Sequence, residues 1–384
     1  WDGKPLLMGY PDNLPEEIRD FFTFRPGQPD YRRGPTRPDH WGWLEVTPQQ
    51  GYGPIDGGRF EQMTVGVAQN ATHQLAPAAM NDPNGAYGRG YTRAAGFDHD
   101  QRAIAAGLNF QEQWEHALQA DPNLIFVTGW NEWIAGRYAN WQGTANAFPD
   151  QFNDEYSRDI EPMKDGFRDN FYYQLVANIR RYKGVPKPVP PSPPQTIDLN
   201  HGFEAWRQVQ PDYHHHRGST MHRHHRGYGS LVYQNHSGRN DIVLAKVARD
   251  RSHVYFYVKT DADLTPHTDP DWMTLLINTD RRQETGWEGF DWVVRCGSAE
   301  PGKGSLEALE PDGASRLVGD IIVVYRDCEL MLAVPRRHLQ MAHSSHLDFE
   351  FKWTDNLGVG DLMDVYLHGE SAPGGRFNFH FQEL

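Results

Sequence analysis

The chain has 384 residues, of which 38% are hydrophobic and 23% are charged, and this length predicts more than one folded domain. The net charge of -14 argues against nucleic acid as a partner, because the chain offers no basic face to a phosphate backbone. No apolar run approaches the roughly 18 residues that a membrane-spanning helix needs, which excludes a membrane span.

The first half of the chain alternates short apolar runs with polar stretches. The nearly continuous apolar character of the runs is typical of parallel strands covered on both faces. Two amphipathic segments, Phe110–Ala120 and Phe167–Tyr182, are predicted to be helices. Strands separated by helices indicate an α/β architecture. The predicted strands are Pro5–Tyr10, Asp20–Arg25, Trp41–Val46, Met63–Asn70 and Leu124–Trp130.

Five strands are too few for a closed (β/α)₈ barrel, which typically takes about 250 residues. Two interpretations compete for residues 1–184: an open sheet, or the C-terminal part of a TIM-type barrel. The chain begins at Trp1 and enters a predicted strand within a few residues. This start favours the partial barrel, with another chain segment as the partner that completes it.

A change of pattern divides the chain. Residues 185–196 contain six prolines and are predicted to form an extended linker. Residues 197–384 carry short alternating runs bounded by turn residues, which predict an antiparallel, all-β sandwich. The predicted strands of this second domain are His253–Thr260, Asp320–Tyr325, Leu330–Val334, Asp348–Trp353, Met363–Leu367 and Arg376–Phe381.

The most informative stretch follows the predicted strand Leu124–Trp130. There Glu132 is flanked by Asn131, Trp130 and Trp133. Strand ends form the active-site face of βα folds, and a carboxyl group among indole rings suits a general acid. The rings also offer flat faces to sugars. The alternative is a solvated glutamate whose neighbouring tryptophans belong to the core.

A second carboxylate, Glu45, lies near the end of the predicted strand Trp41–Val46, close to His40 and Trp43. Cleavage of a glycosidic bond usually takes two carboxyl groups, one that protonates the leaving oxygen and one that acts as base or nucleophile. Glu45 is therefore predicted to be the catalytic partner of Glu132, with Trp41, Trp43 and His40 among the substrate-binding residues. The alternative is a structural glutamate bonded to a neighbouring element.

Further polar residues are candidates for substrate binding. Tyr10 and Arg25 end the first two predicted strands, and Arg25 either binds a hydroxyl or acidic sugar or forms a salt bridge. Asp82 lies in a long loop, where it is either a turn residue or a substrate ligand. The acidic segment Asp150–Glu161 lacks the spacing of a calcium-binding EF-hand and is predicted to be a solvated loop.

Three stretches carry a family resemblance. Trp-Asn-Glu-Trp at 130–133, Ser157–Lys164 and Tyr172–Leu175 together resemble the end of the (β/α)₈ barrel of glycoside hydrolase families 99 and 71. The resemblance covers about residues 1–184 and implies catalytic carboxylates at strand ends, Glu132 among them. No matched motif includes Glu45, and the first strands of the barrel are missing from the pattern.

The second domain resembles the family 9 carbohydrate-binding modules through Trp272–Asp280 and Thr285–Trp292. This resemblance implies sugar stacking on an exposed tryptophan and a structural calcium near Asp280, with no other cofactor required. Trp287 is the best candidate because it lies in a turn outside the alternating strands. The alternative is that these tryptophans fill the core.

Two other features stay structural. Residues 213–226 hold six histidines interleaved with arginines, which would repel a divalent metal, so the His-rich stretch 214–225 is predicted to lie in a polar surface loop. The sequence leaves the pairing of Cys296 and Cys328 open.

Taken together, these features predict a secreted or periplasmic bacterial glycoside hydrolase acting on an oligo- or polysaccharide. Two alternatives remain open. One is a non-catalytic glycan-binding protein. The other is a polysaccharide lyase, for which His40, His73, Tyr10 and Arg25 offer a base and a charge neutraliser.

Overall fold

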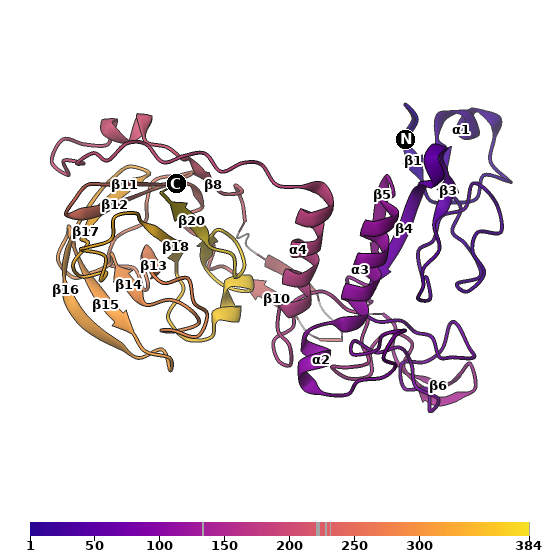
Figure 1. Cartoon of the computed structure of the whole chain (residues 1–384). Coiled ribbons are helices and arrows are strands. Elements are labelled where there is room, and N and C mark those ends of the chain that lie inside the picture. The colour runs from indigo at the N-terminus through magenta and orange to yellow at the C-terminus, as the bar shows by residue number, and fades with distance from the viewer. Residues whose placement is uncertain (133, 220–222, 227–228, 231, 384) are drawn as a thin grey trace. The chain divides into compact units, whose positions relative to one another are not determined.

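The computed structural model describes residues 1–384 apart from 133, 220–222, 227–228, 231 and 384 (Figure 1). The chain divides into two compact units, Trp1–Pro186 (unit 1) and Lys187–Leu384 (unit 2). The division falls inside the proline-rich segment 185–196. In the part of the chain that the structure describes, no helix is long and apolar enough to cross a membrane.

Unit 1 is organised around a three-stranded sheet of β3 (Tyr52–Pro54), β4 (Phe60–Gly66) and β5 (Leu124–Thr128). β3 runs antiparallel to β4, whereas β4 and β5 are parallel, with Met63 opposite Ile125. A parallel pair requires a crossover connection, and helices in the β4–β5 connection make this part a single βαβ unit.

Three helices belong to this layer: α2 (Gln101–Ala105), α3 (Leu108–Ala120) and α4 (Asn170–Lys183). Figure 1 shows α3 running along β4. Helices α3 and α4 bury their apolar faces in the same core as β4, and this burial is the main source of their stability. The core of unit 1 consists of Met63, Val65, Val67, Phe110, Trp114, Ala117, Ile160, Phe171 and Leu175.

Smaller elements complete unit 1. Two short strands pair in parallel around one helix near the N-terminus, and a two-stranded hairpin follows β5. A single 3₁₀ turn precedes β4. These elements are β1 (Leu6–Leu7), α1 (Glu16–Phe21), β2 (Thr23–Phe24), η1 (Asp56–Gly58), β6 (Tyr138–Trp141) and β7 (Thr144–Ala147).

The prediction of a partial TIM-type barrel over residues 1–184 is wrong, because the sheet has three described strands and one βαβ unit. The segment Trp41–Val46, predicted to be a strand, forms only an isolated bridge between Trp41 and Gly27. Its backbone is held by side chains instead: Gln62 donates to the Gly42 carbonyl at 2.7 Å and accepts from the Gly42 amide at 3.0 Å. A partner segment that completes a barrel therefore has no basis.

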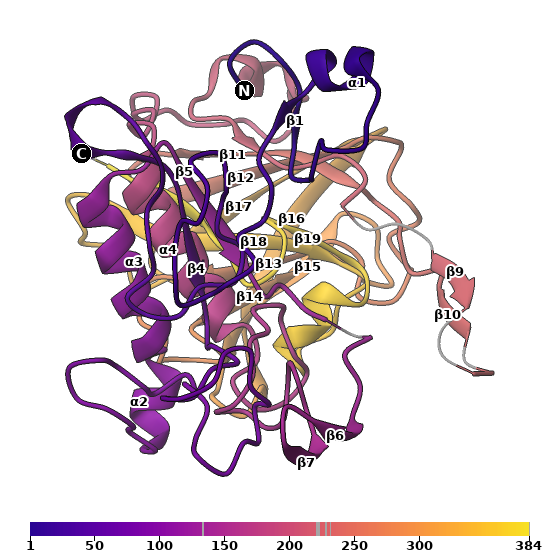
Figure 2. The same cartoon turned by 90° about the vertical axis from the view of Figure 1, so that its right-hand side faces the viewer.

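Unit 2 is built from antiparallel strands. Those that form its main sheet are β8 (Tyr213–His214), β11 (Ile242–Arg249), β12 (His253–Thr260), β13 (Thr274–Asn278), β14 (Trp292–Arg295), β15 (Lys303–Leu309), β16 (Ser315–Arg326), β17 (Glu329–Pro335), β18 (Asp348–Asp355), β19 (Glu370–Ala372) and β20 (Phe379–Gln382). Two 3₁₀ helices, η2 (Glu204–Gln208) and η3 (Leu362–Tyr366), lie outside the sheet. A separate ribbon of β9 (Arg223–Arg226) and β10 (Val232–Asn235) extends away from it (Figure 2).

The main sheet nearly closes on itself. Its order is β19-β18-β13-β14-β15-β16-β17-β12-β11-β8, with β20 paired to β18. At the meeting point of the two ends, the Tyr213 ring of β8 packs edge-on against Phe351 of β18 at 5.1 Å. The Tyr213 hydroxyl also donates to the His380 carbonyl of β20 at 2.9 Å. The architecture is therefore barrel-like.

The predicted two-layer sandwich over residues 197–384 is also wrong, and β16 explains why. Its first part pairs with β15 and its last part, from Val323 to Arg326, pairs with β17. One long strand thus belongs to both halves and makes the sheet continuous. Alternation of apolar residues identifies strands, but it does not show where a strand bends from one half to the other.

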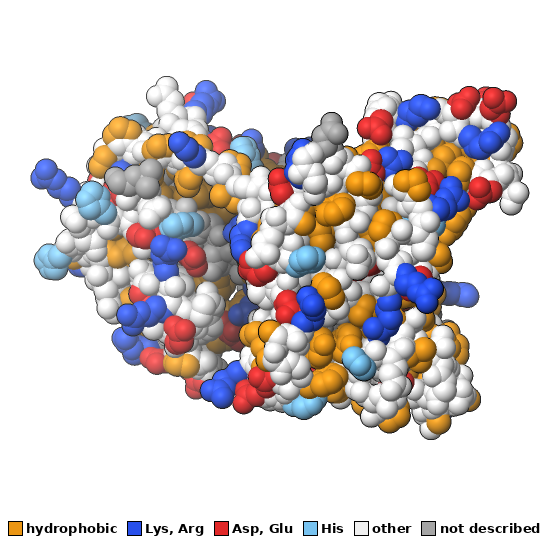
Figure 3. Space-filling view, turned by 45° about the vertical axis from the view of Figure 1, so that its right-hand side comes forward, with side chains coloured by type: hydrophobic (Ala, Val, Ile, Leu, Met, Phe, Trp, Pro, Cys, Tyr) orange, Lys and Arg blue, Asp and Glu red, His pale blue; other side chains and the backbone are white. Residues whose placement is uncertain are grey.

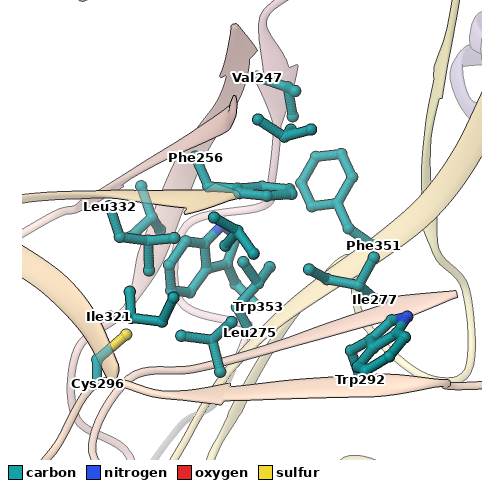
Figure 4. Packing of buried hydrophobic residues seen from close by; sticks show 14 of the residues in the cluster. Val247, Phe256, Leu275, Ile277, Trp292, Cys296, Ile321, Leu332, Phe351 and Trp353 are labelled. Carbon is teal, nitrogen blue, oxygen red and sulfur yellow. The ribbon is translucent and has the colours of Figure 1, made fainter. Parts of the chain in front are cut away.

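The core of unit 2 gathers around aromatic and branched side chains from both halves of the sheet. Figure 4 shows Phe256, Leu332, Leu275 and Phe351 lying around the Trp353 ring, which is fully buried. Cys296 lies in the same core, and it and Cys328 are free thiols, which answers the pairing question.

Candidate functional site

A cleft of about 540 Å³ opens at the carboxyl end of β5 in unit 1. Strand β5, the β6–β7 hairpin, the loop around Trp43 and the segment before Arg158 form its walls. This volume lies within the range of small-ligand sites. Its aromatic lining consists of Tyr31, Trp43, Phe126, Tyr138 and Trp141, and its polar lining includes Asn70, Thr128, Asn131, Glu132, Asp150 and Arg158.

Several apolar side chains of the cleft are left open to solvent. Trp43 is 46% exposed and Tyr138 is 50% exposed. Hydrophobic side chains are visible in patches on the face of unit 1 that Figure 3 shows. Because burial of a large ring is favourable, exposed rings that share one cleft point to a ligand that covers them.

Glycine at position 129 allows the acidic segment to approach the end of β5. Gly129 has a φ of 81°, and a Cβ there would lie 2.3 Å from the Arg158 carbonyl oxygen. The Ile160 amide donates to the Gly129 carbonyl at 2.9 Å, and the Glu161 amide donates to the Trp130 carbonyl at 3.0 Å. These contacts bring Arg158 and the residues around it to the cleft.

Asp150 and Asp159 form a carboxyl pair behind the cleft wall. Both are buried, their side chains share a hydrogen bond, and Asp150 lies 3.4 Å from the Arg158 guanidinium. Burial, this hydrogen bond and repulsion from Asp150 raise the pKa of Asp159 to about 7. Since two adjacent buried carboxylates cannot both ionise readily, Asp159 keeps its proton to a higher pH than an ordinary aspartate does.

A buried arginine fixes the backbone around Asp159. Arg89 donates to the carbonyls of Asp159 at 2.6 Å and Asp154 at 2.8 Å, and its guanidinium lies 4.1 Å from the Phe171 ring. Burial lowers the pKa of Arg89 to about 10, so it stays charged at neutral pH. The prediction that Asp150–Glu161 is a solvated loop is wrong at these positions. The local signal is Arg158 directly before Asp159 in an acidic segment, a pattern that suits an internal ion pair.

Glu45 lies in a smaller cavity next to the cleft, and Tyr31 and Arg158 line both spaces. Its carboxyl group is buried, and it accepts hydrogen bonds from the Tyr52 hydroxyl and, at 3.4 Å, from the Gln50 amide. Burial raises the pKa of Glu45 to about 7. The structure therefore places Glu45 beside Glu132's cleft, with its carboxyl group held by Tyr52.

Of the residues predicted to form a site at the end of β5, Glu132 and Asn131 lie in the cleft and Trp130 does not line it. Glu132 is exposed there, and Asn131 lines the wall while donating to Glu161 at 2.7 Å. The Trp130 ring packs edge-on against Tyr172 at 5.8 Å and is not among the side chains that line the cleft. Trp133 lies outside the described residues.

Arg25 and Trp41 lie in a cluster of their own. Arg25 forms an ion pair with Glu61 at 2.7 Å, and the Trp41 indole donates to the same carboxylate at 2.9 Å. Of the two predicted roles of Arg25, the structure shows the salt bridge. Neither Arg25 nor Trp41 belongs to the cleft lining.

His40 and Tyr10 likewise serve the packing of the N-terminal region. The buried His40 ring is hydrogen-bonded to the Gln28 side chain at 2.9 Å, and burial lowers its pKa. The Tyr10 hydroxyl donates to the Gly27 carbonyl at 2.7 Å. The residues predicted for a lyase therefore do not come together in the cleft.

Asp82 anchors the hairpin that carries two cleft aromatics. It accepts from the Thr144 hydroxyl at 3.1 Å and from the Asn84 amide at 2.8 Å, the second bond being that of a turn. Its neighbour Asn81 donates to the Asn146 carbonyl at 3.0 Å and accepts from the Phe148 amide at 2.9 Å. Asp82 thus holds β6–β7 and is a turn residue.

In unit 2, the expected exposed tryptophan is not found. Trp287 is 6% exposed and packs near Phe290 in a small core cluster. Asp280 accepts hydrogen bonds from the Arg282 amide and the Thr285 hydroxyl, as a turn residue does. Trp272, Trp292 and Trp353 of the same unit are no more exposed than Trp287.

Among the described residues, no group of three or more histidine, cysteine, aspartate or glutamate side chains is placed to hold a metal ion. In the His-rich stretch, the described side chains of His214, His216 and His224 are exposed, whereas His215 lies 3.3 Å from the buried Glu370.

Comparison with known proteins gives no family. No family model matches the chain, and no curated protein or solved structure is significantly similar to it. The resemblance to glycoside hydrolase families 99 and 71 is wrong, because the mostly β structure has no (β/α)₈ pattern. The resemblance of unit 2 to family 9 carbohydrate-binding modules is wrong as well, because its sheet is nearly closed and no family matches. Any glycan-related function has to be argued from the cleft itself.

Proposed function

We propose that unit 1 binds a glycan in the cleft beside β5 and hydrolyses its glycosidic bond. One observation carries the proposal: the wall of an aromatic-lined cleft contains Asp150, whose side chain is hydrogen-bonded to the buried Asp159, a carboxyl group with a pKa raised to about 7. Trp43, Tyr138 and Trp141 offer ring faces to the apolar sides of sugar rings.

The chemistry needs one proton donor and one ionised carboxylate. In the proposal, the Asp150–Asp159 pair gives its proton to the leaving glycosidic oxygen as the C–O bond breaks. Glu132, exposed at the same cleft, acts as the carboxylate that activates water or attacks the anomeric carbon. Water supplies the hydroxyl of the new reducing end, and its remaining proton restores the pair.

Glu45 keeps its catalytic role only as a prediction. Its carboxyl group accepts from Tyr52 and lies outside the open cleft, so the proposal gives it no proton to transfer. Arg158 is a positioning residue, since it pairs with Asp150 at 3.4 Å. A secreted or periplasmic location belongs to the same proposal.

The experiment measures new reducing ends released by the full chain from a panel of oligosaccharides. Asp150→Asn and Glu132→Gln are each expected to lower turnover by about a hundredfold or more, the usual scale of losing acid–base catalysis. Glu17→Gln, an exposed position in α1, is the matched control and should leave turnover unchanged.

Other outcomes identify the rival functions. Binding without any new reducing end, in the wild-type chain, would make unit 1 a non-catalytic glycan-binding domain. Unsaturated products would indicate a lyase. Unchanged turnover in both carboxyl variants would overturn the assignment of the cleft residues.

A further inference from the structure

The charged groups of the cleft are predominantly acidic. Among the described side chains that line it, the ionisable acids are Glu132 and Asp150, and Arg158 is the single basic residue. Glu132 is exposed to any ligand that enters. The charge that a ligand meets therefore depends on whether Arg158 is free to bind it.

Arg158 is not free. Its side chain is 7% exposed, one guanidinium nitrogen lies 3.4 Å from Asp150, and another donates to the Thr128 hydroxyl at 3.5 Å. If Arg158 moved away from Asp150 to bind a ligand, it would leave a buried carboxyl group without its ion-pair partner in a site of low dielectric. Breaking a buried pair in this way is strongly unfavourable. Arg158 is consequently committed to the Asp150–Asp159 pair, and the described cleft lining offers no other basic side chain to balance the charge of Glu132.

Three other arginines of unit 1 are held outside the cleft lining. Arg25 pairs with Glu61 at 2.7 Å, and Arg89 is buried with its bonds to the carbonyls behind the carboxyl pair. Arg137, near the β6–β7 hairpin, donates to the Asn146 side chain at 3.2 Å. None of these three belongs to the cleft lining.

We infer that the cleft selects glycans whose bound units carry no negative charge, favouring amino sugars and then neutral sugars over uronates and sulfated sugars. The inference rests on the proposed function and names its substrate class. Glu132 is the residue that determines this preference, because it attracts an ammonium group and repels a carboxylate or sulfate. The aromatic walls supply binding that does not depend on charge.

The test is binding of the full chain to an array of glucan, xylan and galactan oligosaccharides. Each backbone is present in its neutral form and in a carboxylated or sulfated form, and glucan also in an amino form. At low ionic strength, the neutral form should bind about fivefold to tenfold more tightly than its acidic counterpart, and the amino form more tightly still. High salt should bring both affinity ratios, neutral to acidic and amino to neutral, closer to one because it screens charges.

Glu132→Gln separates the effect of this carboxylate from the overall charge. In this variant, the ratio of the affinities for the amino and the acidic forms should shrink toward one. Glu17→Gln, which changes the net charge by the same amount, should keep the wild-type ratio.

The two hypotheses fail differently. If an acidic form binds as tightly as its neutral backbone or more tightly, the inference is overturned while glycan binding stands, and a lyase becomes the better interpretation. If no member of the array binds, the proposed function fails and the inference fails with it.

Discussion

Two carboxyl groups of unit 1 have pKa values that their surroundings raise well above the usual range. Burial is the main cause for both Glu45 and Asp159, and it raises each pKa to about 7. The ordinary pKa values are 4.5 for Glu45 and 3.8 for Asp159. Between the ordinary and the raised values, the folded state binds more protons than the unfolded state.

This difference predicts how stability depends on pH. The folded state carries the extra protons, so these two groups destabilise it as they ionise. Their contribution to the free energy of unfolding of unit 1 should be most favourable below about pH 4.5 and should fall as the pH rises toward 7. Glu45→Gln should reduce the change in the free energy of unfolding between about pH 4.5 and 7 by a few kcal/mol, the order expected from the pKa shift of Glu45. Urea unfolding of the full chain at several pH values measures it.

Glu17→Gln serves as the control for this prediction, since its exposed side chain should leave the slope as it is. A wild-type stability of unit 1 that rises between pH 5 and 7, with an unchanged slope in Glu45→Gln, would show that the Glu45 carboxyl is ionised in the folded state.

At the scale of elements, the β6–β7 hairpin depends on the loop that contains Asn81. Asn81→Ala removes a donor to Asn146 and an acceptor for Phe148. Each lost bond to a backbone group costs about 1 kcal/mol or more. We expect faster amide hydrogen exchange across Tyr138–Ala147 and weaker glycan binding, because Tyr138 and Trp141 lose their fixed position.

Asn84→Ala is the matched control in the same loop, since its side chain bonds only to Asp82 among the hydrogen bonds described for it. Equal exchange rates in Asn81→Ala and the wild type would mean that other contacts hold the hairpin.

Individual elements were predictable where local pattern decides them. His253–Thr260 alternates regularly and is confirmed as β12 with the same bounds. Phe110–Ala120 is confirmed within α3, which starts two residues earlier. Met363–Leu367 was predicted as a strand but lies mostly in η3, where the Asp361 side chain accepts from the Met363 amide and caps a helical turn.

The site was less predictable, because its chemistry depends on distant contacts. Glu132 and Trp43 were identified from aromatic and acidic residues close in sequence, and both line the cleft. The burial of Asp159 was not predictable in this way. It depends on the close approach of the chain to Gly129 and on hydrogen bonds from Arg89, which is 70 residues away in sequence.

At the scale of the whole molecule, each unit has its own core, and the cleft belongs to unit 1. The buried clusters around Met63 and around Trp353 lie in different units. The family resemblances failed at this scale, because short motifs of strand, turn and aromatic residues occur in many folds. Strand order and sheet closure are set by long-range pairing that such motifs do not encode.

The central claim is that glycans bind in the cleft of unit 1, and indole N–H resonances of the full chain test it most directly. The probe is the oligosaccharide that binds most tightly on the array, titrated into ¹⁵N-tryptophan-labelled protein and assigned with single Trp→Phe variants. We predict shifts at Trp43 and Trp141, with Trp287 and Trp353 of unit 2 unchanged. Saturable binding that shifts only the unit 2 resonances would contradict the account.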